Sequence, residues 1–492
     1  MNMNSIGEIH KFTTDIVWVA TSQLIMALTP FVTLPALTKV YGTEIYGVWQ
    51  QVIITINMFA PILCLRLETA CVRFLSGSES KEKLSEAFGA MLCPVLLFIF
   101  LSLLISLFIK RELSILLFAN TKYTHLIPLT FAWASTEALF IFSLSYLRAR
   151  RKIKKISIIQ SALSIFKTLF IVTLAILEYQ LKSIIIFLII GQTFFLMIIS
   201  IIIIKEIGVP RLNLEGIRQY LYYSIPLIPN GALLWIVNSS DRYFIVHIIN
   251  LKQAGIYSAS YAFGSIISLF FFPISFVLFP TVSKLWEEGN ISDVRKYFEY
   301  SMKYFLLLAI PSAAGLYVVS QSMILILTTS EFMAGSGLVL IIVLSAVLLG
   351  IFQINVFIIH IIQKTKWIAF TIFIGASINV FLNIILIPVL GIMGAAISTL
   401  ISYLVLSSII LIWAKKELSY NIDFKFICKV ILSSALMALC LNQVDIQSFF
   451  GILLVSILGV MIFVLSLWLL KSFSDDEKRF IRLTFSGFYS KR

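Results

Sequence analysis

The sequence is poor in charge and in the residues that usually build catalytic or metal sites. Only 13% of its 492 residues are Asp, Glu, Lys or Arg. The four histidines are scattered with no pair at metal-ligand spacing, and the five cysteines form no close cluster, so we predict neither a metal site nor a disulfide framework. The sequence also lacks a phosphate-binding loop of the type Gly-x-x-x-x-Gly-Lys-Ser/Thr, which argues against ATP hydrolysis by this chain. We therefore predict no catalytic residues and no cofactor.

Hydrophobic residues dominate the sequence instead. They make up 60% of it, and the mean hydropathy of +0.99 lies far outside the range of soluble globular chains. A helix needs about 20 apolar residues to cross a bilayer, and the sequence offers about 14 such runs, so we predict an all-α integral membrane protein. Residues 1–15 lead into the first run without a small-residue cleavage site, which predicts a span and not a signal peptide. The runs cover residues 16–38, 46–65, 87–109, 125–147, 156–177, 183–204, 222–249, 256–280, 302–326, 336–362, 367–387, 392–413, 426–442 and 448–470.

The basic residues are distributed very unevenly between the two sides of these runs. If the amino terminus is cytoplasmic, 30 Lys and Arg residues fall on the cytoplasmic side and 6 on the other. The positive-inside rule then predicts that both termini are cytoplasmic. Six of these residues lie in the loop 148–155. A phosphoinositide or nucleic-acid patch is the alternative interpretation of that loop, but the topology signal accounts for it, and we predict no nucleic-acid partner.

A weak internal repeat divides the chain. Gly47-Val48-Trp49 and Gly255-Ile256-Tyr257 each follow a short polar link after an apolar run, at an offset of 208 residues. Two parallel six-span repeats would place a path for a substrate between them. We therefore expect lobes at residues 1–210 and 211–418, followed by two additional spans and a cytoplasmic tail at 419–492.

Two basic residues, Lys167 and Arg242, lie inside the apolar runs more than one helical turn from either end. A charged side chain near the bilayer centre costs about 2.5 to 3.5 kcal/mol on insertion scales, so such residues usually line a hydrated path. Asn238 precedes Arg242 by four residues and so shares a helix face with it. This pattern predicts a polytopic protein that binds something anionic through Lys167, Arg242 and Asn238.

Two carboxylates also lie inside the runs, and each has two interpretations. Asp241 is either an ion-coupling group or half of a buried structural ion pair. Glu137 is either a protonatable coupling site or a neutral carboxyl held by hydrogen bonds. We keep both residues as candidates for ion coupling.

Two further features lie near the cytoplasmic ends of runs. Arg66 and Arg73 either bind substrate at a cytoplasmic mouth or are ordinary positive-inside flanking residues. Pro226 and Pro229 in the seventh run, followed by Gly231, predict a bend, because proline frees backbone carbonyls. That bend belongs either to a moving helix or to a static kink.

Several stretches together resemble the polysaccharide-transport branch of the multidrug/oligosaccharidyl-lipid/polysaccharide exporter superfamily, which holds bacterial O-antigen and other repeat-unit flippases. The resemblance spans nearly the whole chain and implies a two-lobed, V-shaped helical fold. It also implies basic residues in a central cavity, a requirement that Lys167 and Arg242 fit. Arg66 is a departure, since the family more often has glycine there. The stretches are Leu34–Gly42 with Tyr46–Trp49, Ser240–Tyr243 with Ala254–Ala259, and Asn379–Pro388 with Gly391–Ala396.

The resemblance implies a flippase that moves an undecaprenyl-diphosphate-linked oligosaccharide, such as an O-antigen or other surface polysaccharide repeat unit, across the inner (cytoplasmic) membrane by alternating access. Membrane lipids and polysaccharide polymerase or assembly proteins are the further expected partners. The alternative is a MATE-type cation-coupled multidrug exporter, although its cationic substrates would call for cavity carboxylates without central Lys or Arg. A membrane enzyme of the same polysaccharides would be expected to have a large outer loop, and the predicted outer loops are short.

Overall fold

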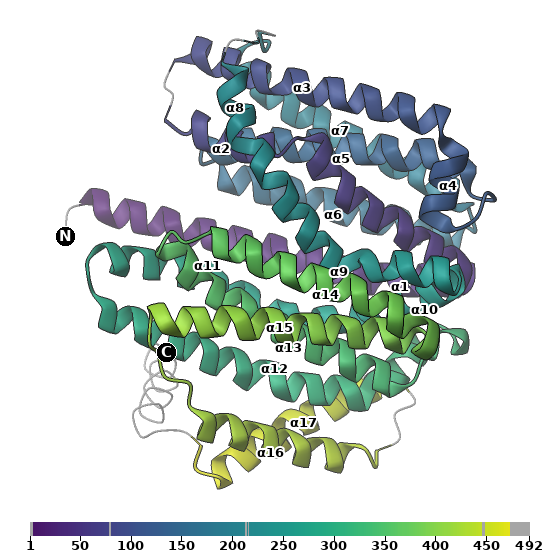
Figure 1. Cartoon of the computed structure of the whole chain (residues 1–492), viewed down its shortest axis with the longest axis vertical. Helices are drawn as coiled ribbons and strands as arrows, with labels where there is room; N and C mark the ends of the chain where they lie inside the picture. Colours follow the sequence, from purple (N-terminus) through teal and green to yellow (C-terminus); the bar gives the residue numbers. More distant parts are fainter. Residues whose placement is uncertain (1–2, 78–79, 212–213, 215, 445–447, 473–492) are drawn as a thin grey trace, which may run out of the picture. The chain divides into compact units, whose positions relative to one another are not determined.

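The computed structural model describes residues 3–77, 80–211, 214, 216–444 and 448–472, and every regular element in these ranges is a helix (Figure 1). The prediction of an all-α protein is therefore confirmed. The α-helices are α1 (Met3–Leu63), α2 (Leu67–Leu75), α3 (Lys81–Phe108), α4 (Lys110–Phe118), α5 (Ile127–Ala149), α6 (Ile153–Ile176), α7 (Leu181–Ile207), α8 (Ile217–Ser224), α9 (Ile228–Ile248), α10 (Leu251–Gly264), α11 (Ser268–Glu287), α12 (Ile291–Leu327), α13 (Ser336–Ile361), α14 (Lys366–Leu390), α15 (Ile392–Glu417), α16 (Phe424–Leu441) and α17 (Phe449–Leu469).

Thirteen helical segments of the described ranges are long and apolar enough to cross a membrane. The first, Val17–Leu63, contains two helices that meet at Gly42, where φ is 69° and ψ is −172°. Glycine adopts this backbone conformation without a steric penalty. The first two predicted runs lie on either side of this break, and each of the other runs matches one segment, extending past it by no more than one residue at either end. The chain is a multi-pass membrane protein.

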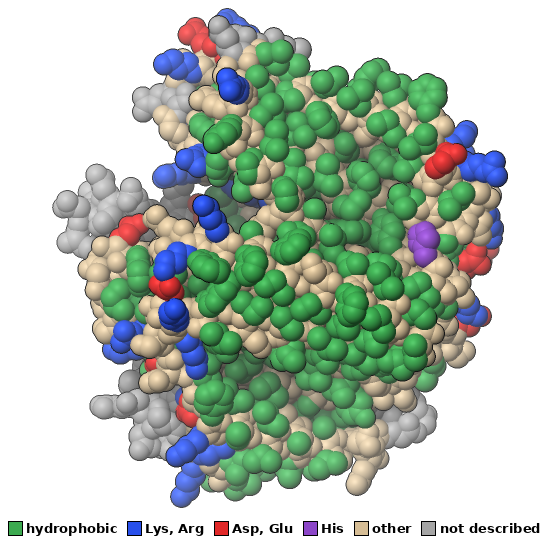
Figure 2. Space-filling model, viewed as in Figure 1, with side chains coloured by type: hydrophobic (Ala, Val, Ile, Leu, Met, Phe, Trp, Pro, Cys, Tyr) green, Lys and Arg blue, Asp and Glu red, His purple; other side chains and the backbone are tan. Residues whose placement is uncertain are grey.

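Large hydrophobic side chains lie on the outside of these helices. Phe108, Leu439 and Trp468 are 82%, 71% and 69% exposed. Figure 2 shows hydrophobic side chains covering the middle of the helices, with most Lys and Arg side chains near helix ends. This distribution suits a helix surrounded by lipid, because hydrocarbon does not penalise exposed apolar groups and leaves backbone polar groups to bond within the helix.

The helices group into two compact units, and each is described by itself. Unit 1 comprises residues 1–262 and 369–402, and unit 2 comprises residues 263–368 and 403–492. These bounds differ from the lobes expected from the repeat, and the division into lobes stays a prediction.

In unit 1, α1 packs along α6, and α5 packs against α1, α2 and α7. Close approach of α6 and α7 depends on Gly191, since a Cβ added there would overlap the ring of Phe166. The seventh predicted run does not form one regular helix. A short 3₁₀ segment, η2 (Ile225–Leu227), separates α8 from α9, and Pro226 and Pro229 lie at this interruption. Whether it moves stays a prediction.

The two glycine motifs of the repeat contact each other inside unit 1. A Cβ added at Gly47 would overlap the carbonyl oxygen of Leu251, and one added at Gly255 would overlap the carbonyl oxygen of Thr43. The contact is reciprocal, because Thr43 and Leu251 are separated by the same 208 residues as the two glycines. Small residues at such positions allow two membrane helices to pack backbone against backbone.

In unit 2, the long helix α12 packs against α11, α13, α16 and α17. Val319, Phe426, Val430 and Met437 belong to a buried apolar cluster among these helices. An apolar cavity of about 510 Å³ lies along α12, α16 and α17. The hydroxyl of the buried Tyr420 donates to Asn355 Oδ1 at 2.6 Å and so links the α15–α16 connection to α13.

Candidate functional site

Lys167 and Glu137 form an ion pair inside the spans of unit 1. Lys167 on α6 and Glu137 on α5 are 30 residues apart in sequence, and the distance from Nζ to Oε2 is 3.4 Å. Their side chains are 22% and 25% exposed. The structure thus joins two residues that the sequence identified separately, and it gives the intramembrane lysine a counter-ion.

A chain of hydrogen bonds holds the carboxylate of this pair. Gln192 on α7 donates from Nε2 to Glu137 Oε2 at 2.6 Å. Trp133 on α5 donates from Nε1 to Gln192 Oε1 at 2.9 Å. Gln192 is completely buried and Trp133 nearly so. Because both amide atoms of Gln192 are engaged, its orientation is fixed and the position of the Glu137 carboxylate with it.

The ion pair borders a cavity of about 210 Å³ between α1, α5 and α6. Apolar side chains such as Phe140 and Leu163 form much of its wall. Hydroxyl groups lie beside Lys167: Thr29 and Ser164 are hydrogen-bonded at 2.6 Å, and Thr168 donates to Thr29 at 3.1 Å. The cavity therefore combines an apolar wall with one cation, one anion and several hydroxyl groups.

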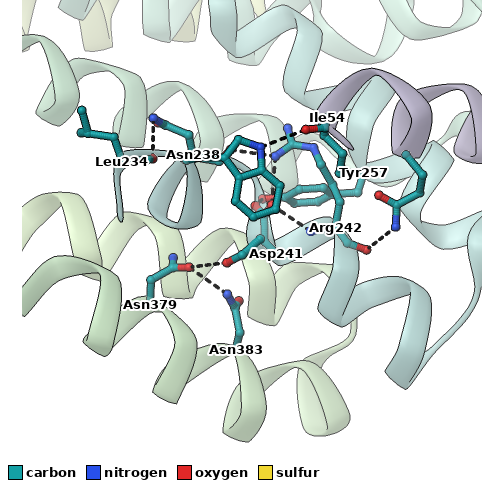
Figure 3. Close-up of polar contacts among 11 residues, drawn as sticks. Ile54, Leu234, Asn238, Asp241, Arg242, Tyr257, Asn379 and Asn383 are labelled. Atoms are coloured by element: carbon teal, nitrogen blue, oxygen red, sulfur yellow. Dashed lines mark hydrogen bonds and ion pairs between the residues drawn. The ribbon is translucent and has the colours of Figure 1, made fainter. Parts of the chain in front are cut away.

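Asp241 and Arg242 form a second ion pair, on α9 (Figure 3). Arg242 Nη1 lies 2.9 Å from Asp241 Oδ1, and the two side chains are only 8% and 1% exposed. Tyr257 on α10 donates its hydroxyl to Asp241 Oδ2 at 2.5 Å. The Arg242 guanidinium carbon lies 4.2 Å from the centroid of the Tyr261 ring, a distance typical of a cation–π contact. Both charges are enclosed by partners.

Asn238 contributes to this cluster through its backbone. Its carbonyl oxygen accepts a hydrogen bond from Arg242 Nη1 at 2.9 Å, while its side chain donates to the carbonyl of Leu234 at 2.9 Å. The shared face predicted for Asn238 and Arg242 is present. The roles of both residues in substrate binding stay predictions, and the structure gives Arg242 a structural counter-ion as well.

Two asparagines of α14 lie beside the same cluster. Asn379 Oδ1 accepts from Asn383 Nδ2 at 3.0 Å and from Ser240 Oγ at 3.4 Å. Both amides are fully buried, and Asn379 Nδ2 and Asn383 Oδ1 have no hydrogen-bond partner among the described residues. Orphaned buried polar atoms are costly and call for an explanation.

Within the described ranges, no three His, Cys, Asp or Glu residues gather as a metal site.

Arg66 has an unusual backbone conformation at the break between α1 and α2. Its φ is 55° and its ψ is 19°, in the left-handed region that costs a non-glycine residue about 1 to 2 kcal/mol. A glycine, which the resemblance implies at this position, would adopt these angles without that cost. Its Nε lies 3.4 Å from Glu68 Oε1, and its guanidinium lies beside Gly231 of α9. Burial raises the pKa of the Glu68 carboxyl, while Arg66 acts in the opposite direction.

Other basic residues near the helix ends have structural partners. The exposed Arg73 lies 4.5 Å above the ring of Tyr223 on α8. Arg150 and Lys152 both pair with Glu206 at the end of α7. The role of Arg73 in substrate binding and the topological interpretation of the loop 148–155 stay predictions.

Sequence reasoning missed Gln192, Trp133, Tyr257 and Tyr261 as members of these two clusters. Gln192 left one signal, since it is a neutral amide in an otherwise apolar run. The aromatic residues left none, because membrane helices contain many aromatic residues at lipid interfaces.

The fold is that of the multidrug/oligosaccharidyl-lipid/polysaccharide exporter superfamily. An inward closed conformation of lipid II flippase MurJ matches with a TM-score of 0.77 and 18% sequence identity, over 92% of this chain and 98% of that one. An inward-facing multidrug resistance transporter of the MATE family matches with a TM-score of 0.64 and 12% identity, over 82% of this chain and 98% of that one. At these identities the likeness establishes the fold alone.

The chain belongs to the family described as "Polysaccharide biosynthesis protein", which matches residues 12–286, more than half of its length. The suspected membership in the polysaccharide-transport branch is thereby confirmed. The probable flippase AglR of Haloferax volcanii is 26% identical over 215 residues, which are 42% of this chain and 45% of AglR. The chain spans less than half the length of the curated relatives it matches.

Proposed function

We propose that this chain is a flippase that moves a polyprenyl-diphosphate-linked oligosaccharide across the membrane by alternating access and catalyses no chemical reaction. The observation that carries the proposal is Lys167, a cation inside the apolar spans that borders a 210 Å³ cavity. Membership in a polysaccharide biosynthesis family and the likeness to proteins named as flippases support it.

The chemistry of the headgroup requires such a cation. A diphosphate loses its hydration when it enters the low-dielectric core, and fixed cations and hydrogen-bond donors replace the lost water. We assign the main contact with the diphosphate to Lys167. The further candidates for substrate binding at the cytoplasmic end are Arg66 and Arg73. The candidates deeper in unit 1 are Asn238 and Arg242.

We infer that an ion gradient or the membrane potential drives the cycle. Moving one elementary charge through 100 mV is worth about 2.3 kcal/mol, enough to bias a transport cycle without ATP. Glu137 and Asp241 are the candidate coupling carboxylates. Glu137 has more support, because it borders a cavity and its side chain is 25% exposed, whereas the side chain of Asp241 is 1% exposed.

The finer assignments concern the membrane and the partners. We propose an undecaprenyl-type lipid, an O-antigen or other surface polysaccharide repeat unit, a location in the inner (cytoplasmic) membrane with cytoplasmic termini, and supply to polymerase or assembly proteins. The 30 to 6 partition of basic residues supports the orientation. Reporter fusions after Lys122 and Lys154 should report opposite sides, and a report from the same side rejects the orientation.

The experiment that tests the function is transport in proteoliposomes that contain only this protein. A fluorescent diphosphate-linked oligosaccharide lipid should cross faster than in protein-free vesicles, with the pH gradient, sodium gradient and potential imposed one at a time. A deletion strain should accumulate lipid-linked sugar on the cytoplasmic side. If the protein instead exports organic cations and leaves the lipid in place, the MATE-type alternative holds. Lipid movement that ignores all three gradients makes the protein an uncoupled facilitator.

A further inference from the structure

We propose that Glu137 is a built-in counter-anion that keeps free anions off Lys167, and that Gln192 positions it so that only a membrane-anchored headgroup takes its place. This inference rests on the proposed function and makes Glu137 a specificity-determining residue. Its first basis is the unequal geometry of the two hydrogen bonds to Glu137 Oε2. The bond from Gln192 is short, at 2.6 Å, and the bond from Lys167 is long, at 3.4 Å.

The Glu137 carboxylate is therefore held mainly by Gln192 and less by Lys167. Gln192 is completely buried and is itself fixed by Trp133, so it stays in place if Lys167 departs. Glu137 would then keep a charge-assisted hydrogen bond, and no buried anion would be left without a partner. Gln192 thus lowers the free energy needed to separate Lys167 from Glu137.

The lysine is the mobile member of the pair. The Lys167 side chain has a flexible four-carbon stem, is 22% exposed and borders the cavity. Thr29 and Ser164 also line the cavity, and their hydroxyl groups, which are hydrogen-bonded to each other at 2.6 Å, can turn to donate to an anion's oxygen atoms. An anion that enters the cavity can thus draw the ammonium group away from Glu137.

A free anion gains too little from this exchange. It must replace a carboxylate that is already in place and must approach the same negative charge, and such like-charge juxtaposition suppresses wrong partners. A lipid-linked headgroup is confined to the bilayer, so its effective concentration at the site is far higher than that of a free anion. The pair therefore rejects soluble phosphates and admits a tethered headgroup.

Inorganic pyrophosphate tests this exclusion. We expect Glu137→Gln to bind pyrophosphate at least about tenfold more tightly than the wild-type protein, because the competing negative charge is gone. Thermal stabilisation of the purified full-length protein by pyrophosphate is the first readout, and inhibition of lipid movement in proteoliposomes without an imposed ion gradient is the second. The double variant Glu137→Gln, Lys167→Ala should lose the binding. Equal binding by wild type and Glu137→Gln overturns the inference, and so does binding that survives removal of Lys167.

Gln192→Leu tests the positioning role. We expect slower lipid movement in proteoliposomes without an imposed ion gradient, because Lys167 can then leave only by stranding Glu137. We expect Glu137→Gln in the same chain to restore that rate, since coupling to an ion gradient is not measured in this assay. A purely structural role for Gln192 predicts no such rescue and overturns the positioning claim. The proposed function fails separately: if the wild type moves no lipid-linked sugar but pyrophosphate still binds Glu137→Gln through Lys167, the flippase assignment falls and the counter-anion remains.

Discussion

The Lys167–Glu137 pair and the Asp241–Arg242 pair both lie inside the spans of unit 1, but they differ in how they are held. The first joins two helices over 3.4 Å, with side chains 22% and 25% exposed beside a cavity. The second joins consecutive residues of α9 over 2.9 Å, with side chains 8% and 1% exposed. Tyr257 and Tyr261 enclose it further.

This difference indicates which ion pair can separate so that a substrate anion replaces one partner. A buried pair is strongly destabilised when one partner is removed, because the other charge is left without compensation. A partly exposed pair beside a cavity can separate at lower cost, because water or a ligand solvates its members. We therefore expect the Asp241–Arg242 pair to maintain the fold and the Lys167–Glu137 pair to open during transport.

Breaking the buried pair should have the largest effect. Asp241→Ala leaves Arg242 buried without its counter-ion, which costs about 3 to 5 kcal/mol. We expect a large loss of folded protein in detergent, measured by size-exclusion chromatography of the membrane extract. The control is Asp241→Ala combined with Arg242→Met, which removes both charges and should recover much of the folded fraction. A single variant as stable as wild type would contradict the structural role.

Removing the cation of the exchangeable pair should separate function from folding. Lys167→Ala leaves Glu137 hydrogen-bonded to Gln192, so we expect normal accumulation of folded protein. Transport of lipid-linked sugar should fall by about tenfold or more, since a charge-assisted contact to the headgroup is lost. Lys205→Ala, at an exposed site near the end of α7, is the matched control and should transport normally. Normal transport by Lys167→Ala would reject the anion-binding role.

Removing one hydroxyl should test the enclosure of the buried pair. Tyr257→Phe keeps the aromatic ring and removes the donor that lies 2.5 Å from Asp241 Oδ2. Hydrogen bonds to charged groups contribute about 1.5 to 3 kcal/mol, so the unfolding midpoint in detergent should fall clearly. Tyr317→Phe, on α12 in unit 2, is the reference and should shift it less. Equal shifts would show that the hydroxyl of Tyr257 has no special role.

Neutralising Glu137 should have the smallest effect on stability. Glu137→Gln keeps the side-chain volume and an oxygen that can accept from Gln192, and Lys167 borders a cavity in which water can solvate it, so this variant should unfold at nearly the wild-type temperature. A midpoint drop as large as that of Asp241→Ala would erase the distinction between the two pairs.

The spans could be predicted from the sequence, because hydropathy over about 20 residues is a local property. The break at Gly42 and the interruption between α8 and α9 also follow from local residues, one glycine and two prolines. The pairing of Lys167 with Glu137 could not be predicted, since it depends on how α5 and α6 pack. Gln192 escaped notice for a related reason: an uncharged amide gives a weak signal, and its role appears only when α7 places it beside Glu137.

Arg66 illustrates a different limit. The resemblance implies glycine at this position, and the backbone angles give the physical reason, a left-handed conformation between α1 and α2. Asn379 and Asn383 lie in one of the stretches that carry the family resemblance. Their unsatisfied atoms could not be predicted, because hydrogen-bond partners depend on neighbouring helices.

The reciprocal contact of Gly47 and Gly255 has a consequence for synthesis of the chain. The ribosome makes about 5 to 20 residues per second, so the second glycine follows the first by roughly 10 to 40 s. During that interval the Gly47 face of α1 has no α10 to pack against, although its own span is complete. We expect the nascent amino-terminal half to wait in the membrane with this surface uncovered, so that assembly of unit 1 finishes only after residues from the second half have been inserted.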